Sequence, residues 1–269
     1  MRVFVIRDDE LDRKDLGYLL YYEQSKSFYI ELPSTADEWD TPLILSSFIR
    51  RGEHSVNAYW SLQWVRQRII PQDRQNLGQI LRDNNLPEYD ELALLLLGHG
   101  RCAQDNVYIE EIPDLPDSIK QRWYYKIEDV IPLSDYCLLV FFRDGSARKI
   151  AIKELTKGTR SFIPYLSCEE RFNTVMIQPD GYGIQWSDGA VLSDQFLYHS
   201  GEIIPLKLDD FYRFVSLRIV NTAEAQKLLN CSRQNIADLV KRGKLHPVRT
   251  DGNNRLFKLI EIQQRMKNE

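Results

Sequence analysis

Three side chains suited to reading base pairs stand together near the end of the chain. Arg233, Gln234 and Asn235 directly follow Ser232, a residue type that commonly caps helices. An arginine can form two hydrogen bonds with guanine, and glutamine or asparagine can do so with adenine, each pair giving about 1–3 kcal/mol of discrimination. Residues at the start of a recognition helix are those that reach base edges. The sequence therefore predicts base contacts from Arg233, Gln234 and Asn235.

A second set of side chains is suited to binding phosphate. Residues 217–269 carry 11 Lys and Arg against 5 Asp and Glu, whereas residues 1–216 carry 24 against 34, so a basic segment follows an acidic body. Contacts to the DNA backbone are independent of sequence, and their number sets the salt dependence of binding. The alternative interpretation is a solvated helix face without a partner. The predicted phosphate contacts are Ser232, Lys241, Arg242, Lys244, Arg249, Asn254 and Arg255.

Two short helices joined by a tight turn are predicted to position these residues. Thr222 can cap a first helix that runs to Leu229. Ser232 can cap a second helix, the predicted recognition helix 232–242, which Gly243 ends. Behind the helices, turn-forming residues separate two short strand candidates, and a last helix follows. The predicted strands of this wing are 244–248 and 255–258, its tip is 251–254, and the last helix is 259–266.

The stretch 220–262 resembles the excisionase-like and mercury-resistance-regulator-like winged helix-turn-helix domains. Their pattern is a capped first helix with an Ala-Glu-Ala core, a Ser-capped recognition helix, Arg-Gly-Lys-Leu, a wing and a closing Arg-x-Phe. The residues in register with that pattern are Thr222, Ala223, Glu224, Ala225, Leu228, Leu229, Ser232, Arg233, Ile236, Arg242, Gly243, Lys244, Leu245, Arg255 and Phe257. The resemblance implies DNA binding with the second helix in the major groove.

The middle of the chain is rich in strand and turn signals. Residues 136–143 read as a continuous apolar strand, Asp144-Gly145 as a hairpin turn, and 147–152 as the returning strand. A second hairpin is predicted between 174–178 and 182–186, with Asp188-Gly189 after it. The order resembles the bacterial domain-of-unknown-function family 2442, which implies a small α+β domain and no established activity. The matching residues are Pro132, Leu133, Asp144, Gly145, Phe172, Gly183, Ile184, Trp186, Asp188, Gly189, Leu197 and Tyr198. Packing of Trp186 and Phe172 in a core explains both without a binding role.

The first block combines strand and helix patterns, and a proline cluster at 113–116 predicts its end. The expected strands are 2–7, 17–22 and 27–32, and the expected helices begin at Pro42 or span 59–69, 74–84 and 89–97. The fold class is therefore α+β and multi-domain. The expected units are an α+β N-terminal domain over 1–115, a small hairpin-rich α+β domain over 120–212 and the winged helix-turn-helix over 217–269.

A rival site lies in the N-terminal block. Arg66, Arg68, Arg74 and Arg101 surround a glycine-bracketed stretch that also holds His99, Cys102 and Asp105, a set that can bind an anion. His99 and Cys102 can also act as base and nucleophile, since thiol catalysis needs a nearby imidazole. Their spacing matches no known catalytic motif. An enzyme with an anion or thiol site here is the third hypothesis.

Several common classes lack their signatures. The chain shows no phosphate-binding loop, dinucleotide fingerprint or zinc-protease motif, its four cysteines show no CxxC spacing, and no cofactor or metal is predicted. The longest apolar run, 92–97, is far shorter than the roughly 20 residues that span a bilayer. The N-terminus does not resemble a signal peptide, so we expect a cytoplasmic protein and no membrane contact.

These observations favour a bacterial or phage-type transcriptional regulator that binds double-stranded DNA and has no catalytic activity. One small winged domain binds weakly, so we expect a homodimer. The alternative is an antitoxin-like protein whose acidic body binds a partner protein while the helix-turn-helix regulates its own expression.

Overall fold

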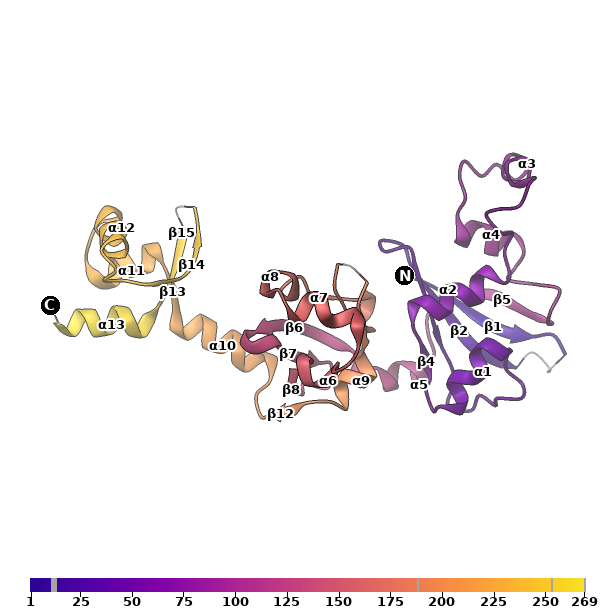
Figure 1. The fold of residues 1–269 in the computed structure, drawn as a ribbon, viewed down its shortest axis with the longest axis horizontal. Coiled ribbons are helices and arrows are strands. Elements are labelled where there is room, and N and C mark those ends of the chain that lie inside the picture. The colour runs from indigo at the N-terminus through magenta and orange to yellow at the C-terminus, as the bar shows by residue number, and fades with distance from the viewer. Residues whose placement is uncertain (11–13, 188, 253, 269) are drawn as a thin grey trace.

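The computed structural model describes residues 1–10, 14–187, 189–252 and 254–268, which form three regions that follow one another along the long axis (Figure 1). Helices and antiparallel sheets occur together, which confirms the α+β fold class. Asp188 of the second predicted turn and Asn253 of the predicted wing tip lie outside the described residues. In the described part of the chain, no helix is long and apolar enough to cross a membrane.

The N-terminal region is built on a five-stranded antiparallel sheet of order β4-β3-β2-β1-β5. The strands are β1 (Arg2–Asp8), β2 (Asp15–Tyr22), β3 (Ser27–Glu31), β4 (Ser55–Val56) and β5 (Val107–Ile112). The helices are α1 (Leu43–Arg50), α2 (Ala58–Arg66), α3 (Leu77–Asp83) and α4 (Glu91–Leu97). One face of the sheet packs against Phe48, Trp64 and Leu95 from α1, α2 and α4. The three predicted strands are confirmed, whereas the predicted helix 74–84 is shorter and β5 was not predicted.

The other face of this sheet is covered by the chain that follows it and by the middle region. Leu115 and Ile119, the latter on α5 (Asp117–Lys120), pack against it. Tyr182 of the middle region stacks on Tyr29 with ring centroids 4.1 Å apart. The proline cluster at 113–116 is therefore part of a packed junction between the two regions.

The middle region combines a four-stranded and a three-stranded sheet, of order β12-β8-β7-β6 and β11-β10-β9. Its strands are β6 (Ile127–Leu133), β7 (Cys137–Phe142), β8 (Ala147–Ala151), β9 (Met176–Ile177), β10 (Gly183–Gln185), β11 (Val191–Ser193) and β12 (Glu202–Ile204). Its helices are α6 (Ile152–Leu155), α7 (Ile163–Leu166), α8 (Glu169–Phe172) and α9 (Asp194–Tyr198). The Asp144-Gly145 hairpin is confirmed, and Gly145 has the positive φ of +79° that such turns require. The indole N–H of buried Trp186 donates to the Phe172 carbonyl at 2.9 Å, as expected of a core residue.

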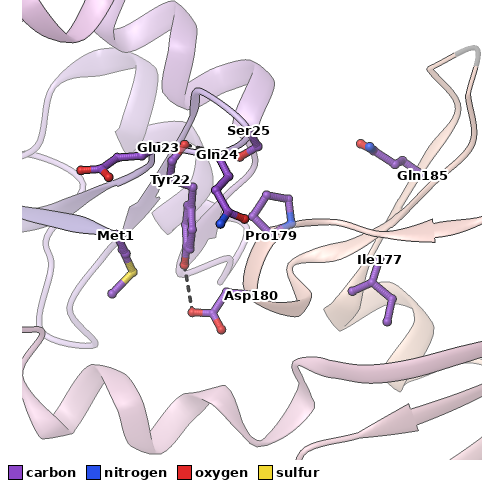
Figure 2. A pocket seen from close by; sticks show the side chains of 9 residues that line it. All are labelled: Met1, Tyr22, Glu23, Gln24, Ser25, Ile177, Pro179, Asp180 and Gln185. Atoms are coloured by element: carbon purple, nitrogen blue, oxygen red, sulfur yellow. Dashed lines mark hydrogen bonds between the residues drawn. The ribbon is translucent and has the colours of Figure 1, made fainter.

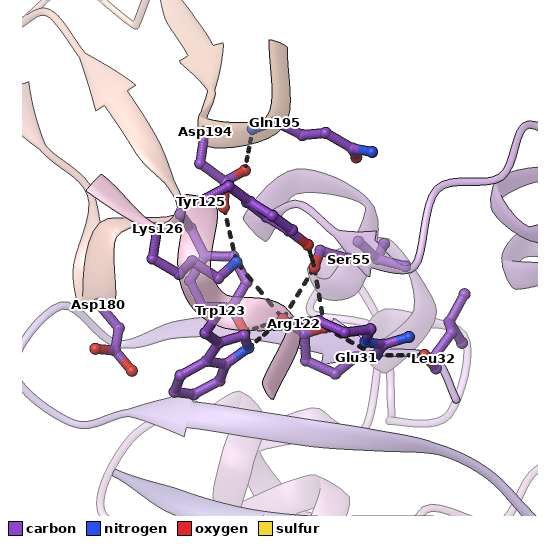
Figure 3. A network of polar contacts seen from close by, with 12 residues as sticks. Glu31, Leu32, Ser55, Arg122, Trp123, Tyr125, Lys126, Asp180, Asp194 and Gln195 are labelled. Carbon is purple, nitrogen blue, oxygen red and sulfur yellow. Dashed lines mark hydrogen bonds and ion pairs between the residues drawn. The ribbon is translucent and has the colours of Figure 1, made fainter. Parts of the chain in front are cut away.

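A buried polar network joins the N-terminal and middle regions (Figure 3). The Lys126 Nζ lies 2.8 Å from Asp194 Oδ2 and 3.6 Å from Glu31 Oε1, and all three side chains are almost completely buried. The Tyr182 hydroxyl donates to Glu31 at 2.6 Å, and Ser55 donates to the same carboxylate. Burial raises the pKa of Asp194 even though Lys126 opposes the shift.

An open cleft of about 530 Å³ lies at the rim of this junction, beside the β2–β3 turn (Figure 2). The Tyr22 hydroxyl donates to Asp180 Oδ2 across it at 2.9 Å. Arg143 also pairs with Asp180. The polar contacts at the rim therefore tie the two regions together.

The C-terminal region follows a connecting helix, α10 (Leu208–Arg218). Its remaining elements are β13 (Ile219–Asn221), α11 (Thr222–Leu229), α12 (Arg233–Lys241), β14 (Pro247–Asp251), β15 (Asn254–Lys258) and α13 (Leu259–Asn268). The strands form an antiparallel sheet of order β13-β15-β14. This is the predicted order of two helices, a two-stranded wing and a last helix.

Candidate nucleic-acid interface

The first helix of the C-terminal region begins with a capping box. The Asn221 side chain accepts a hydrogen bond from the Glu224 backbone N–H at 3.0 Å, and Glu224 accepts one from the Asn221 N–H at 2.8 Å. The prediction that Thr222 caps α11 is therefore wrong. The Thr222 hydroxyl instead lies 3.2 Å from the backbone oxygen and nitrogen of Arg255, so it joins α11 to the wing.

The turn between α11 and α12 is tight and well bonded. Asn230 ends α11 with a positive φ of +47°, and the Cys231 N–H donates to the Gln226 carbonyl at 3.1 Å. The Ser232 hydroxyl then accepts from the Asn235 N–H at 3.2 Å, which confirms Ser232 as the cap of α12. This turn fixes the direction in which α12 leaves α11.

A small apolar core holds α12 against the rest of this region. Ile236 and Leu239 on α12 are buried, whereas Arg233, Gln234 and Asn235 are exposed. The buried members of the core are Ala225, Ile236, Leu239, Leu245, Phe257 and Ile262. Because the core occupies one face of α12, the opposite face is free to meet a ligand. Gln234, Asp238 and Lys241 recur on that outer face at helical spacing.

A hollow of about 500 Å³ lies between the start of α11, the start of α12 and the wing. It brings Arg233 together with Asn254 and Arg255, three residues that the sequence predicted as DNA contacts. Asn221 and Gln226 also line it, and neither was predicted. Gln226 lies four residues after Thr222, so helical spacing from the start of α11 was the signal for it. The hollow can hold a polar or anionic group beside the recognition helix.

The predicted phosphate contacts form two groups at opposite ends of α12. Lys241, Arg242 and Lys244 are exposed around its C-terminal end, about 12 Å along the axis from Arg233 at a rise of 1.5 Å per residue. The other group lies near the wing and the start of α12. Its members are Ser232, Arg249, Asn254 and Arg255. Two separated basic groups can contact the two backbones that border a groove.

In the rival N-terminal cluster, Arg68 and Asp105 form an ion pair. Arg68, whose side chain is 2% exposed, lies 2.5 Å from Asp105 through Nη2 and Oδ2 and contacts the Cys102 sulfur at 3.4 Å. Among the contacts of the described residues, none joins Cys102 to His99. Two further arginines also pair with carboxylates, Arg66 with Glu91 and Arg101 with Asp9. The described residues contain no group of three His, Cys, Asp or Glu side chains that could hold a metal ion.

Acid should weaken this ion pair. Burial alone would raise the pKa of Asp105, but hydrogen bonds and charge from Arg68 outweigh burial and lower it. A carboxylate with a lowered pKa in the folded state stabilises the fold above its unfolded pKa of about 3.9, and this contribution is lost as the pH falls through the folded value. We expect Asp105→Asn to lower the free energy of unfolding by about 2 kcal/mol at neutral pH.

The difference in the free energy of unfolding between wild type and Asp105→Asn, measured by urea unfolding, should become smaller as the pH falls below about 4. Asp73→Asn, at an exposed position, is the control and should change stability little at any pH. A difference for Asp105→Asn that stays constant with pH would contradict the role of the carboxylate charge.

The two helices, the tight turn and the wing define a winged helix-turn-helix, a class of DNA-binding domain. In agreement, residues 219–269 match a family described as a helix-turn-helix domain. Residues 127–202 match a family described as a protein of unknown function, DUF2442. Both resemblances expected from the sequence are confirmed. Comparison with curated proteins and with solved structures gives no significant match. The helix-turn-helix supports a DNA-binding regulatory role for the C-terminal region.

Proposed function

We propose that this protein is a sequence-specific transcriptional regulator of a bacterial or phage type, which places α12 in the major groove of double-stranded DNA. The observation that carries the proposal is the start of α12, where Arg233 and Gln234 are exposed and Arg233 borders the hollow beside the wing. The proposal assigns the chain no catalytic step.

Two copies are proposed to bind two half-sites. A single winged domain buries little surface on DNA, whereas a two-fold dimer reads a palindromic site with half-sites about 34 Å apart. The three regions of one chain include one such domain, so the second half-site requires a second copy.

Selection from a random duplex pool tests the proposal directly. The full chain is mixed with the pool at low and at high salt, and the retained DNA is sequenced. We expect an enriched, roughly palindromic motif and a steep fall in retention at high salt, because released counterions drive the backbone contacts. Retention without any enriched motif would contradict sequence-specific regulation. The absence of retention at both salt concentrations would contradict DNA binding itself.

Arg233 and Lys241 are expected to act differently once a motif is known. Arg233→Ala should weaken binding to the preferred motif by about 1–3 kcal/mol and relax the preference at one base pair, because it removes a base contact. Lys241→Ala should weaken binding to all sequences equally and reduce the salt slope by about one, because it removes a phosphate contact. Titrations of the motif and of a scrambled duplex measure both effects. Lys157→Ala, at an exposed position, is the control and should change neither the affinity nor the salt slope. If Arg233→Ala and Lys241→Ala had equal effects on both duplexes, this division of roles would be refuted.

A further inference from the structure

The connecting helix α10 carries apolar side chains that the described residues leave uncovered. Its N-terminal end is docked, since Leu208 and Phe211 pack on Leu139 and Phe141 of the middle region. Beyond Phe211, every residue from Tyr212 to Arg218 is exposed. The large apolar side chains in that stretch are Tyr212, Phe214, Val215 and Leu217, with exposed fractions of 53–60%.

A helix that only bridges two domains through solvent is normally polar all round, because nothing covers it. Helix α10, which connects the middle and C-terminal regions in Figure 1, instead has four large exposed apolar side chains within two turns. Phe214 and Leu217, three residues apart, lie on one side of the helix, and exposed apolar side chains grouped in this way mark an interaction site. A partner is therefore required for this stretch of α10.

The charges on α10 indicate what that partner is. Asp210, Phe214 and Arg218 lie four residues apart, so they form one ridge along the helix with an acid at one end, an aromatic ring in the middle and a base at the other end. Such a ridge is complementary to itself when it is reversed. In an antiparallel pair that crosses at Phe214, each Asp210 lies opposite the Arg218 of the other copy. A parallel pair would place like charges together.

We infer that α10 is the dimerisation helix of this protein and that it pairs antiparallel with α10 of a second copy around a two-fold axis near Phe214. A two-fold interface uses the same patch on both copies, as this ridge allows. Asp210 also accepts a hydrogen bond from the Lys207 N–H at 2.9 Å, and a carboxylate has further lone pairs for an arginine. Because α10 leads directly into β13 and α11, the pair sets the spacing of the two recognition helices. Only this last consequence rests on the proposed function.

The molar mass of the full chain without DNA tests the inference. Light scattering behind size-exclusion chromatography should give twice the 31.7 kDa of one chain at high micromolar concentration. Phe214→Asp should raise the dimer dissociation constant at least about 30-fold, because it removes a central contact and places two carboxylates at the crossing point. Ile163→Asp on α7, an apolar position of the same 60% exposure, is the matched control and should remain dimeric.

Charge reversal tests the antiparallel arrangement. Arg218→Asp should weaken the dimer, and Asp210→Arg combined with Arg218→Asp should restore part of the association, with circular dichroism used to check that α10 remains helical. The inference would be overturned if the wild type were monomeric at every concentration, or if Phe214→Asp were as dimeric as the wild type. In either case the exposed face of α10 would be assigned to a different partner protein. A double variant no better than Arg218→Asp would overturn the antiparallel pairing. DNA binding is measured separately, so a dimer that binds no DNA refutes only the proposed function.

Discussion

Replacing Lys126 by methionine is expected to lower the free energy of unfolding by about 3–5 kcal/mol, because it leaves the buried Asp194 carboxylate without its cation. Among the described residues, the cation that Glu31 keeps is Arg122, whose Nη2 lies 3.6 Å from Glu31 Oε2. Lys126 is completely buried, pairs with Asp194 at 2.8 Å and lies 3.3 Å from the centroid of the Tyr182 ring. Methionine fills a similar volume, so the loss should come from charge rather than from a cavity. The expected effect is large because Lys126 is the cation between Glu31 and Asp194, two almost completely buried carboxylates.

Unfolding by guanidinium chloride measures this loss of stability, and Lys153→Met at an exposed position is the control.

The pH dependence of the loss separates the effect of charge from that of packing. Burial already raises the pKa of Asp194, and removal of Lys126 should raise it further. A carboxyl group with a raised pKa in the folded state contributes most below its unfolded pKa of about 3.9, and its contribution falls as the pH rises. The variant should therefore recover stability relative to wild type in acid, and Lys126→Met with Asp194→Asn should recover part of it at neutral pH. A loss that neither acid nor the second substitution reduces would refute the ion-pair explanation.

This network also shows what the sequence does not reveal. Glu31 on β3, Lys126 just before β6 and Asp194 on α9 lie far apart along the chain, and no local pattern distinguishes them from surface charges. They become an ionic cluster only when Tyr182 inserts against the N-terminal sheet. The proline cluster at 113–116 predicted the end of the first block, and β5 ends at Ile112, but the packing of Leu115 and Tyr182 on the N-terminal sheet was not predicted. Both features depend on which residues, distant along the chain, become buried together, and a local sequence pattern does not reveal that.

Local signals were reliable where one residue determines a turn or a cap. Asp144-Gly145 predicted its hairpin because few residues accept the turn dihedrals, and Ser232 predicted the start of α12 because its hydroxyl satisfies a backbone N–H. Thr222 failed because the capping-box spacing starts one residue earlier, and the pattern Asn221-x-x-Glu224 was present in the sequence. Strand β5 was missed because Glu110 and Glu111 break its apolar alternation.

Cross-strand ion pairs explain why β5 forms despite those charges. Arg2 and Arg7 on β1 lie beside the two glutamates, and Arg2 binds Glu111 at 2.7 Å. Pairs of opposite charge on neighbouring strands stabilise a sheet, but only the strand order reveals which charges meet. In the C-terminal region, the two wing strands were predicted, but β13, which pairs with β15, was not. Arg233, Asn254 and Arg255 were each predicted as DNA contacts, but the sequence did not predict the hollow that they line together with Asn221 and Gln226.

Phe257→Ala is expected to unfold the C-terminal region and abolish DNA binding. Phe257 on β15 is completely buried and packs with Ala225, Ile236 and Leu239, so its side chain holds the wing and α12 to one core. Truncation of a buried phenylalanine costs about 3–5 kcal/mol. A region of the size of 219–269 is stable by only about 3–8 kcal/mol at the usual value per residue, so this one loss removes most of its stability.

The full-length variant should fail to retain duplex DNA, and limited proteolysis should cut within 219–269 while the preceding regions remain protected. Val248→Ala, on the neighbouring wing strand β14 and 54% exposed, is the control and should bind nearly as wild type. If Phe257→Ala bound DNA with wild-type affinity, the small core would not be what holds α12 in its binding position. If both variants lost binding while the protease pattern stayed unchanged, the wing surface itself, rather than the core beneath it, would be the part that contacts DNA.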